Sequence, residues 1–351
     1  MEGEVLVVDN GSTDNSVAIA EKAGARVVHE SVKGYGAAIK RGIVEAKGKW
    51  IIMADADDSY DLENLEPFVE KLKQGKHLVM GNRFKGGIEA GAMPWLHQFI
   101  GNPVLSFIGR LFFGIKIKDF HCGIRAFDKA KMLELELQSQ GMEFASEMVV
   151  KSALFGLKMA EVPTKLSKSG RRGPSHLNTW RDGWRHLRFL MLYSPSWLFL
   201  YPGVFLLVLG AVLSGILIST PIHFFGIVLD IHTLMYSNLL VILGYQSIVI
   251  YFFTRMFAYE RKLIPAADDM RLAFGWVNME KGLIVGLLML AVGLYVSIDA
   301  FLGWNKLGFS PLDPAKTSRE VVPAITLIIL GFQTILYSFF FSFIGQKFMK
   351  Q

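Results

Sequence analysis

Cysteine is nearly missing from this chain, since one residue, Cys122, occurs among 351. A single cysteine cannot form an internal disulfide, which excludes a disulfide-stabilised scaffold. Charged residues are also scarce, at 19%, while hydrophobic residues make up 52%, which excludes an intrinsically disordered chain. Residues 1–196 carry 27 basic and 23 acidic side chains, whereas residues 197–351 carry only 10 and 8. A charge-rich region is therefore joined to an apolar one, and a wholly soluble protein is not expected.

The apolar region contains three long runs without Asp, Glu, Lys or Arg, at Trp197–Thr220, Ile231–Thr254 and Val321–Gln346. Each exceeds the roughly 20 residues that cross a bilayer. A shorter run begins at Gly282 and has Asp299 near its end. Buried helices of soluble proteins usually keep a polar face, which these runs lack. We predict four membrane-spanning helices, at about 197–220, 231–256, 282–304 and 321–346.

Basic residues beside the spans predict their orientation, because Lys and Arg favour cytoplasmic loops. Such residues precede the first span, lie between the second and third, and follow the fourth: Arg171, Arg172, Arg181, Arg185, Arg188, Arg261, Lys262, Arg271, Lys281, Lys347 and Lys350. The first-to-second loop has none, although the third-to-fourth loop has Lys306, Lys316 and Arg319. We expect an integral protein of the inner or plasma membrane, with both termini and the charge-rich region in the cytoplasm.

The charge-rich region alternates apolar runs with helical segments. We expect strands at 4–9, 25–29, 49–54 and 77–80, and helices at 16–24, 36–46 and 62–73. This alternation is typical of an α/β domain with a mostly parallel sheet. In such sheets the ligand binds beyond the carboxyl ends of the strands. Asp9 ends one predicted strand and the Asp55–Asp58 cluster follows another, so we expect a ligand site at that edge.

The cluster Asp55, Asp57 and Asp58 places three carboxylates within four residues. Such charges repel one another unless cations compensate them. Mg²⁺ or Mn²⁺, held by one or two carboxylates together with substrate phosphates, is the natural compensator. The alternative is a helix N-terminus, which favours acids and suits Asp61 and partly Asp58. For Asp55 and Asp57 we favour a metal site.

Two features suggest phosphate binding. Gly34 and Gly36 open a predicted helix, where backbone amides can meet a phosphate. Arginines recur at Arg83, at Arg125 and as the Arg171–Arg172 pair, and planar guanidinium groups suit phosphate. Each arginine alone is more often a surface residue. Their number beside membrane segments favours an anionic lipid headgroup as ligand.

Two segments before the first span mix apolar and basic residues. Residues 94–117 are expected to form one or two helices at the membrane surface, with ordinary core packing as an equal alternative. Residues 177–193 interleave Trp180 and Trp184 with arginines, which suits the headgroup region. Nucleic acid is the other partner of such stretches, but the position beside a span argues against it. We therefore predict a cytoplasmic domain at 1–176, a juxtamembrane helix at 177–196 and a membrane domain at 197–351.

Several motifs together resemble a known family. Val5–Ser16 (VLVVDNGSTDNS), Lys33–Gly42 and Asp55–Asp58 resemble the family-2 glycosyltransferases with the GT-A fold. Within that family, the segments 81–84, 119–125 and 170–175 resemble dolichol-phosphate mannose synthase and the polyprenyl-phosphate glycosyltransferases of bacteria. The resemblance covers about residues 4–190. It implies metal-dependent, inverting transfer of a sugar from a nucleotide-sugar (GDP-mannose or UDP-hexose) to a polyprenyl or dolichyl phosphate.

The resemblance also implies residue roles. Asp9, Lys33 and Gly34 would bind the nucleotide-sugar, and the DXD motif at Asp55 and Asp57 would hold the metal and the pyrophosphate. The groups expected to bind the lipid phosphate are Arg83, Arg125, Arg171, Arg172 and Ser175. Asp57, Arg83 and Arg125 are the expected catalytic residues. Glu147 matches a family acid on a helix, without an assigned role.

Two departures from the family pattern leave a different outcome open. Ser59 stands where mannose-synthase relatives often have Gln, which weakens the predicted metal site. Family members also begin with a further strand and an Asn-Glu loop, for which Met1–Gly3 leave no room. We therefore expect an amino-terminally truncated chain, whose sheet would have unpaired backbone groups beside the missing strand. The alternative is a catalytically impaired homologue that acts as a membrane-bound binding or scaffold protein.

Two further functions are disfavoured. A processive polysaccharide synthase would carry a Gln-x-x-Arg-Trp motif, which this sequence lacks. A transporter would need more ionisable groups within its spans than Asp299 supplies. Self-association of the four helices stays open.

Overall fold

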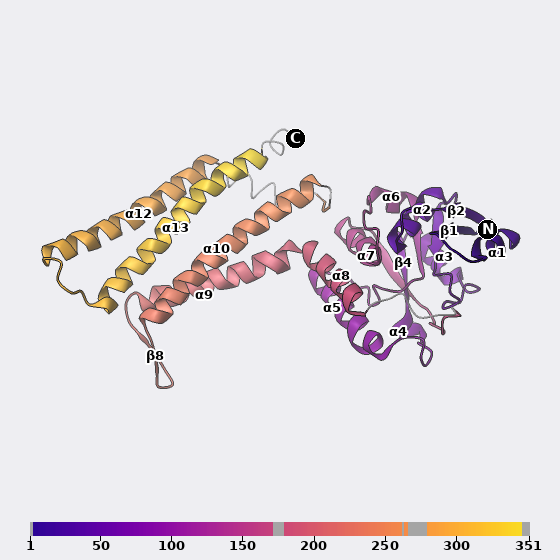
Figure 1. The fold of residues 1–351 in the computed structure, drawn as a ribbon, viewed down its shortest axis with the longest axis horizontal. Helices are drawn as coiled ribbons and strands as arrows, with labels where there is room; N and C mark the ends of the chain where they lie inside the picture. The colour runs from indigo at the N-terminus through magenta and orange to yellow at the C-terminus, as the bar shows by residue number, and fades with distance from the viewer. Residues whose placement is uncertain (1–2, 171–178, 262, 266–278, 346–351) are drawn as a thin grey trace. The chain divides into compact units, whose positions relative to one another are not determined.

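The computed structural model describes residues 3–170, 179–261, 263–265 and 279–345. The chain divides into two units, Met1–Ser194 and Pro195–Gln351 (Figure 1). The boundary falls at the change from charge-rich to apolar sequence.

The first unit contains the strands β1 (Leu6–Asp9), β2 (Arg26–His29), β3 (Trp50–Met53), β4 (Leu78–Asn82), β5 (Arg125–Asp128) and β6 (Met159–Pro163). β1 and β2 pair in parallel and form a sheet of their own. The other four strands form a sheet in the order β3-β5-β4-β6, in which β5 runs antiparallel to β3 and β4 while β4 and β6 are parallel. The mostly parallel α/β sheet predicted from the sequence is confirmed, with β5 as its antiparallel member. No ladder joins β1 to β3 among the described residues.

The helices of this unit are α1 (Ser16–Lys22), α2 (Tyr35–Glu45), α3 (Glu66–Lys73), α4 (Arg83–Gly86), α5 (Asn102–Phe113), α6 (Lys129–Glu134), α7 (Phe144–Leu154) and α8 (Thr179–Leu192), with a π-helical turn at His97–Gly101 before α5. α3 begins four residues later than predicted, because the Asp61 carboxylate accepts a hydrogen bond from the amide of Glu63 and forms a turn. α5 ends at Gly114, whose φ of 65° is the left-handed helix end that glycine favours.

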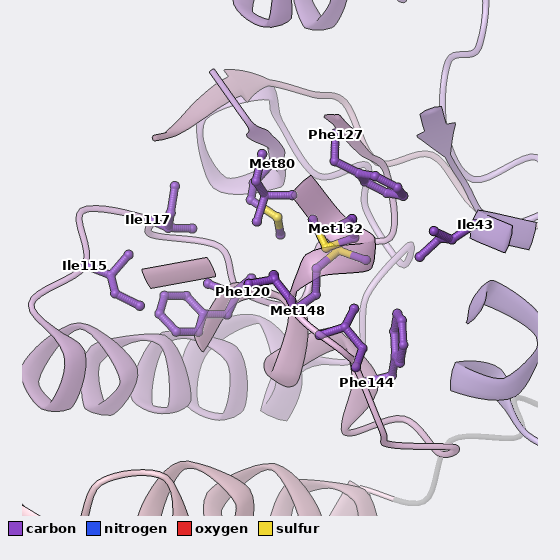
Figure 2. Packing of buried hydrophobic residues seen from close by; sticks show 13 residues of the cluster. Ile43, Met80, Ile115, Ile117, Phe120, Phe127, Met132, Phe144 and Met148 are labelled. Carbon is purple, nitrogen blue, oxygen red and sulfur yellow. The ribbon is translucent and has the colours of Figure 1, made fainter. Parts of the chain in front are cut away.

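The largest core cluster of this unit lies between the sheet and α7. Phe127 from β5 and Met80 from β4 are fully buried in it, and Phe144 and Met148 come from α7 (Figure 2). Such close packing of large side chains supplies most of the stability of a domain this size. α7 is thereby fixed against the strands that carry the site.

The two amphipathic segments form helices as predicted. The inner face of α8 buries Phe189 and Leu190 beside Leu105 and Ile108 of α5. Large apolar side chains remain exposed on these segments: Trp95, Phe99, Ile100, Val104, Phe107, Leu111, Trp180 and Trp184. Exposed apolar area of this extent is typical of a surface that meets lipid or protein.

The second unit contains a π-helical turn at Ser196–Leu200, α9 (Tyr201–Leu217), the hairpin β7 (Ile222–Phe224) and β8 (Ile227–Leu229), and the long helices α10 (Ile231–Glu260), α12 (Met279–Lys306) and α13 (Pro314–Gly345). Among the residues that the structure describes, four helical segments are long and apolar enough to cross a membrane, with bounds of Ser196–Leu217, Ile231–Glu260, Met279–Lys306 and Pro314–Phe343. They contain the predicted spans for most of their length, and α12 continues through Asp299. The hairpin was not predicted, because its runs are too short to stand out between two apolar helices.

Glycines allow close approach of the helices in this unit. A Cβ at Gly203 of α9 would lie 3.0 Å from the carbonyl of Gly244 in α10, and one at Gly331 of α13 would lie 2.7 Å from the carbonyl of Gly286 in α12. Small residues at such crossings are characteristic of membrane helix pairs. Asn238 adds a polar contact, since it donates to Ser214 of α9 and accepts from a hydroxyl of α13.

Candidate active site

Asp9, the last residue of β1, is held by the turn that follows it. Its carboxylate accepts hydrogen bonds from the amides of Ser12 (2.9 Å) and Gly11 (3.3 Å) and lies 3.0 Å from Nδ1 of His29. Hydrogen bonds from Ser12, then His29 and the Gly11 amide, hold the pKa of Asp9 well below its ordinary value. Asp9 therefore stays ionised at neutral pH and presents a fixed negative charge at the end of the strand.

Lys33 and Gly34 lie close to the Asp9 turn. A Cβ at Gly11 would come within 2.8 Å of the Lys33 amine, so this amine lies over the turn. The Gly34 amide donates to Oδ1 of Asn10 at 2.8 Å. The Asn10 amide group in turn donates to the carbonyls of Glu30 and Val32, which fixes the loop before α2.

The first amides of α2 have a partner within the protein. Gly36 and Ala37 donate to the carbonyl of Gln140, at 2.8 and 3.2 Å. Gly34 has a φ of 149°, and a Cβ there would collide with the same carbonyl. The glycines at this helix start therefore serve a close backbone contact, and the amides expected to meet a phosphate are occupied by Gln140.

Asp57 lies in the loop after β3 and is partly exposed. Its Oδ1 accepts from the hydroxyl of Ser59 at 2.5 Å, and its Oδ2 accepts from the hydroxyl of Ser169 at 3.1 Å. The amide of Gly170 donates to the Asp57 carbonyl at 2.8 Å. These contacts orient the carboxylate through neutral donors and leave its negative charge without compensation from them.

Asp55 packs against the segment 119–125. Its Oδ2 lies so close to Gly123 that a Cβ at this glycine would overlap it. The Gly123 amide donates to the hydroxyl of Tyr60 at 2.9 Å, which fixes this part of the segment. Burial and then the nearby charge of Asp55 raise the pKa of Tyr35, so Tyr35 at the start of α2 also lies close to Asp55. The structure thus brings the loop after β3, the 119–125 segment and the start of α2 together.

The two aspartates of the predicted DXD motif suit a hard divalent cation. Within the described parts of the chain, no group of three or more His, Cys, Asp or Glu side chains is placed to hold a metal ion. Mg²⁺ commonly takes only one or two carboxylates and fills its shell with substrate phosphates and water. Asp57, oriented by two hydroxyls, and Asp55 nearby are a fitting oxygen-donor set for a cation that arrives with a pyrophosphate.

Arg83 is buried and bound to Asp119. The sequence placed Asp119 in a motif but did not identify it as a site residue. The Nε and Nη2 atoms of Arg83 donate to the two carboxylate oxygens at 2.8 and 2.7 Å, and the Arg83 amide adds a third bond at 3.1 Å. Glu161 of β6 holds the loop in turn, accepting from the amides of Lys118 and Asp119. Such a two-pronged Arg–carboxylate pair is among the strongest polar contacts in proteins.

Arg125, at the start of β5, is 1% exposed. Its guanidinium donates to three backbone carbonyls, those of Cys122 (2.9 Å), Ala145 (2.7 Å) and Phe120 (3.0 Å). In this arrangement it closes the 120–125 turn and ties it to α7. A lipid phosphate would reach Arg125 only if that turn opened, so its expected phosphate contact stays a prediction.

The remaining predicted residues fall into two groups. Arg171, Arg172 and Ser175 lie outside the described residues. Asn10, Asp119, Gly123 and Ser169 were not predicted individually as site residues, although Asp119 and Gly123 lie within a quoted motif. Ser169 had no sequence signal, because a lone serine before a basic pair has no distinctive pattern.

Comparison with known proteins identifies the family of this chain. Residues 2–135 match "Glycosyl transferase family 2", and residues 252–345 match "Glycosyltransferase family 2 C-terminal transmembrane region". The low-salt glycan biosynthesis hexosyltransferase Agl6 of Haloferax volcanii is 34% identical over 98% of this chain and 82% of its own length. A dolichyl-phosphate hexose transferase of the same organism is 29% identical over 51% of this chain and 76% of its own length.

One solved structure is similar in part. It is glucosyl-3-phosphoglycerate synthase of Mycobacterium tuberculosis in complex with Mn²⁺, UDP and glucosyl-3-phosphoglycerate. The likeness covers 54% of this chain and 67% of that one, with 18% identity and a TM-score of 0.40.

The chain belongs to glycosyltransferase family 2. It is a glycosyltransferase with a GT-A-like α/β domain followed by four apolar helices, and it is an integral membrane protein. The resemblance inferred from the motifs is thereby confirmed.

Proposed function

We propose that this protein transfers a hexose from a nucleotide-sugar to a polyprenyl or dolichyl phosphate. The observation that carries the proposal is the convergence of the loop after β3 with the 119–125 segment and Ser169. This places Asp57, an oriented and partly exposed carboxylate, beside Asp55. The names of the two Haloferax relatives, a hexosyltransferase and a dolichyl-phosphate hexose transferase, support a hexose donor and a lipid phosphate acceptor.

On this proposal the donor nucleotide lies along the edge formed by the ends of β1 and β3. Asp9 and Asn10 meet the nucleobase, and the Lys33 amine, which lies over the same turn, meets a phosphate. Asp55 and Asp57 would hold Mg²⁺ or Mn²⁺, which would supply neutralising charge to the diphosphate of the donor. GDP-mannose and UDP-hexoses are the donor candidates.

The acceptor supplies its own nucleophile. The second pKa of a phosphate monoester is near ~6, so the lipid phosphate is largely a dianion at neutral pH. One of its oxygens forms a bond to the anomeric carbon while the bond from that carbon to the pyrophosphate breaks. The leaving diphosphate takes the electron pair, and the anomeric centre inverts. No protein base is required, and the protein contributes orientation and positive charge.

The lipid phosphate is proposed to meet Arg83, with help from Arg171, Arg172 and Ser175. Two nitrogens of the Arg83 guanidinium, Nε and Nη2, bind Asp119. The third, Nη1, is the one proposed to meet the lipid phosphate. Arg171, Arg172 and Ser175 follow Gly170, whose amide is bound to Asp57. Gly170 thus links the two sets of groups, because its amide binds Asp57 on the donor side and the proposed acceptor residues follow it in the sequence.

The first unit, Met1–Ser194, is called the catalytic unit from here on, and it is proposed to face the cytoplasm. Arg319 had weakened the charge bias, because it lies in a loop expected on the opposite side. Its guanidinium is bound to the Asp230 carboxylate and to the Leu217 carbonyl, so its charge is neutralised within the membrane unit. The greater number of basic residues in the segments expected on the cytoplasmic side supports this orientation.

The test uses purified full-length protein with Mg²⁺, polyprenyl phosphate and a panel of labelled nucleotide-sugars. We expect one donor class to label the lipid and Asp57→Ala to reduce the rate by about 100-fold or more. Asp61→Ala, an exposed aspartate in the same loop region, is the matched control and should keep full activity. The absence of labelled lipid with every donor would contradict the proposal. Donor binding without transfer would instead favour the binding-protein alternative.

A further inference from the structure

Glu147 and Lys151 form an ion pair in the interior of the catalytic unit. They lie one turn apart on α7, both side chains are completely buried, and Nζ lies 3.1 Å from Oε1. Removing two charges from water is costly, and an apolar pair of similar size is often equally stable or more so. The stability of α7 alone therefore does not explain why charged residues occupy these positions.

The pair is bound to the backbone of the α6–α7 loop, defined as residues 135–143. Glu147 accepts hydrogen bonds from the amides of Gln138 (2.9 Å) and Ser139 (2.7 Å). Lys151 donates to the carbonyls of Leu135 (3.1 Å) and Glu136 (2.9 Å). The two side chains thus satisfy four backbone groups that an apolar pair would leave without partners, and they set the path of this loop.

The same loop holds the start of α2. The carbonyl of Gln140 accepts from the amides of Gly36 and Ala37, and the Ser139 carbonyl lies where a Cβ of Gly36 would be. Just before α2, the Gly34 amide is bound to Asn10 next to Asp9. A displacement of the loop would therefore move the segment that carries Lys33 and Gly34.

We propose that Glu147 and Lys151 are positioning residues for the nucleotide-sugar donor. They act through the α6–α7 loop and the start of α2, and neither touches the substrate. This inference rests on the proposed function, because it assigns Asp9, Lys33 and Gly34 to the donor side of the site. It gives Glu147 the role that the sequence left open.

The decisive variant is the double substitution Glu147→Met with Lys151→Met in the full-length protein. Methionine fills similar volume without charge, and water can bond to the four freed backbone groups once the loop shifts outward, so the melting temperature should fall only slightly. The loop, having lost four hydrogen bonds, should shift towards water. We expect the KM for the nucleotide-sugar to rise by about tenfold, while the KM for polyprenyl phosphate is unchanged.

The matched control is Val150→Ala on the same helix. Val150 is fully buried against Phe189 and Leu190 of α8, in a cluster that contains no residue of the α6–α7 loop, so its truncation should lower the melting temperature without altering the donor KM. If the ion pair has a purely structural role, the double variant should instead have a much lower melting temperature and unchanged KM values. That result would overturn the proposal.

A second measurement does not depend on catalysis. Hydrogen–deuterium exchange should be faster at the amides of Gly36 and Ala37 in the double variant, and unchanged in Val150→Ala. If the double variant does not fold, the single change Glu147→Gln is compared with Val150→Ala in the same way. Unchanged exchange would refute the positioning role. If the wild-type protein transfers no sugar but exchange is altered in the double variant, the positioning of α2 by the ion pair is retained and the proposed function is refuted.

Discussion

Asp57 and Asp119 are both loop carboxylates of the catalytic unit, but their partners differ in kind. Asp119 is completely buried, and a guanidinium grips both of its oxygens. Asp57 is partly exposed, and two serine hydroxyls orient it. A carboxylate paired with arginine has its negative charge balanced within the fold. A carboxylate held by neutral donors keeps a full charge that a bound cation can neutralise.

The largest expected effect comes from removing the buried partner. Asp119→Ala leaves Arg83 charged and buried, which should lower the free energy of unfolding by about 3–5 kcal/mol. Denaturant or thermal unfolding of the catalytic unit, followed by tryptophan fluorescence, measures it. Asp57→Ala should change stability by less than about 1 kcal/mol. Equal losses of unfolding free energy in the two variants would contradict the distinction between the arginine-paired and the serine-bound carboxylate.

A pH titration extends the comparison to the packing of α8 on α7. His186 of α8 lies 2.8 Å from the Ser146 hydroxyl of α7, and burial lowers its pKa from 6.5 to about 4. The unfolded chain therefore takes up a proton first as the pH falls. Stability should be full above pH 6.5 and decline between 6.5 and 4, by up to about 3 kcal/mol from this residue.

Melting temperatures between pH 7.5 and 4.5 test this decline. His186→Gln removes the titrating group and should flatten the curve over that window. Burial also lowers the pKa of His121, whose ring contacts that of His186, so part of the slope should persist in the variant. A curve for His186→Gln as steep as that of the wild type would assign the pH response to other groups.

Gly123→Ala tests the donor side without removing any charge. The new Cβ would overlap the Asp55 carboxylate, which must move away. A displacement of about 1 Å at a reacting site can reduce the rate by about 100-fold. Sugar transfer under saturating donor measures this loss. Gly183→Ala in α8, where a Cβ meets nothing within 4 Å, is the control and should keep the wild-type rate.

The smallest expected effect is that of Ser169→Ala. Loss of its hydroxyl leaves Asp57 oriented by Ser59 alone. Groups that orient metal ligands typically contribute 10-fold or more to metal affinity, so we expect Mn²⁺ binding in the presence of UDP or GDP to weaken by about tenfold. Titration calorimetry measures the affinity. Unchanged affinity would show that the Ser169 contact does not support the cation site.

Much of the catalytic fold could be predicted because its strands and helices have strong local patterns. The apolar runs that became β1 and β3 end directly in Asp9 and in the Asp55–Asp58 cluster, so the edge that carries the site was visible in the sequence. β5 was not predicted. Its four residues include Arg125 and Asp128, and only its pairing with β3 on one side and β4 on the other makes it a strand.

The partners within the site could not be predicted, because they are distant in sequence. Asp57 and Ser169 are 112 residues apart, and Arg83 and Asp119 are 36 apart. A motif identifies an arginine as important but does not say whether its nitrogens meet a ligand or a carbonyl. For Arg125 three carbonyls are the observed partners, and the spacing of the motif held no information about them.

The strand order also affects how the protein is made. Because β5 lies between β3 and β4, the edges of these two strands stay open on the ribosome until Asp128 has been synthesised. Synthesis at roughly 5–20 residues per second makes this delay several seconds long. The last strand of this sheet, β6, ends at Pro163, and the first apolar span begins only at Ser196. The order of synthesis thus allows the sheet to close before membrane insertion begins.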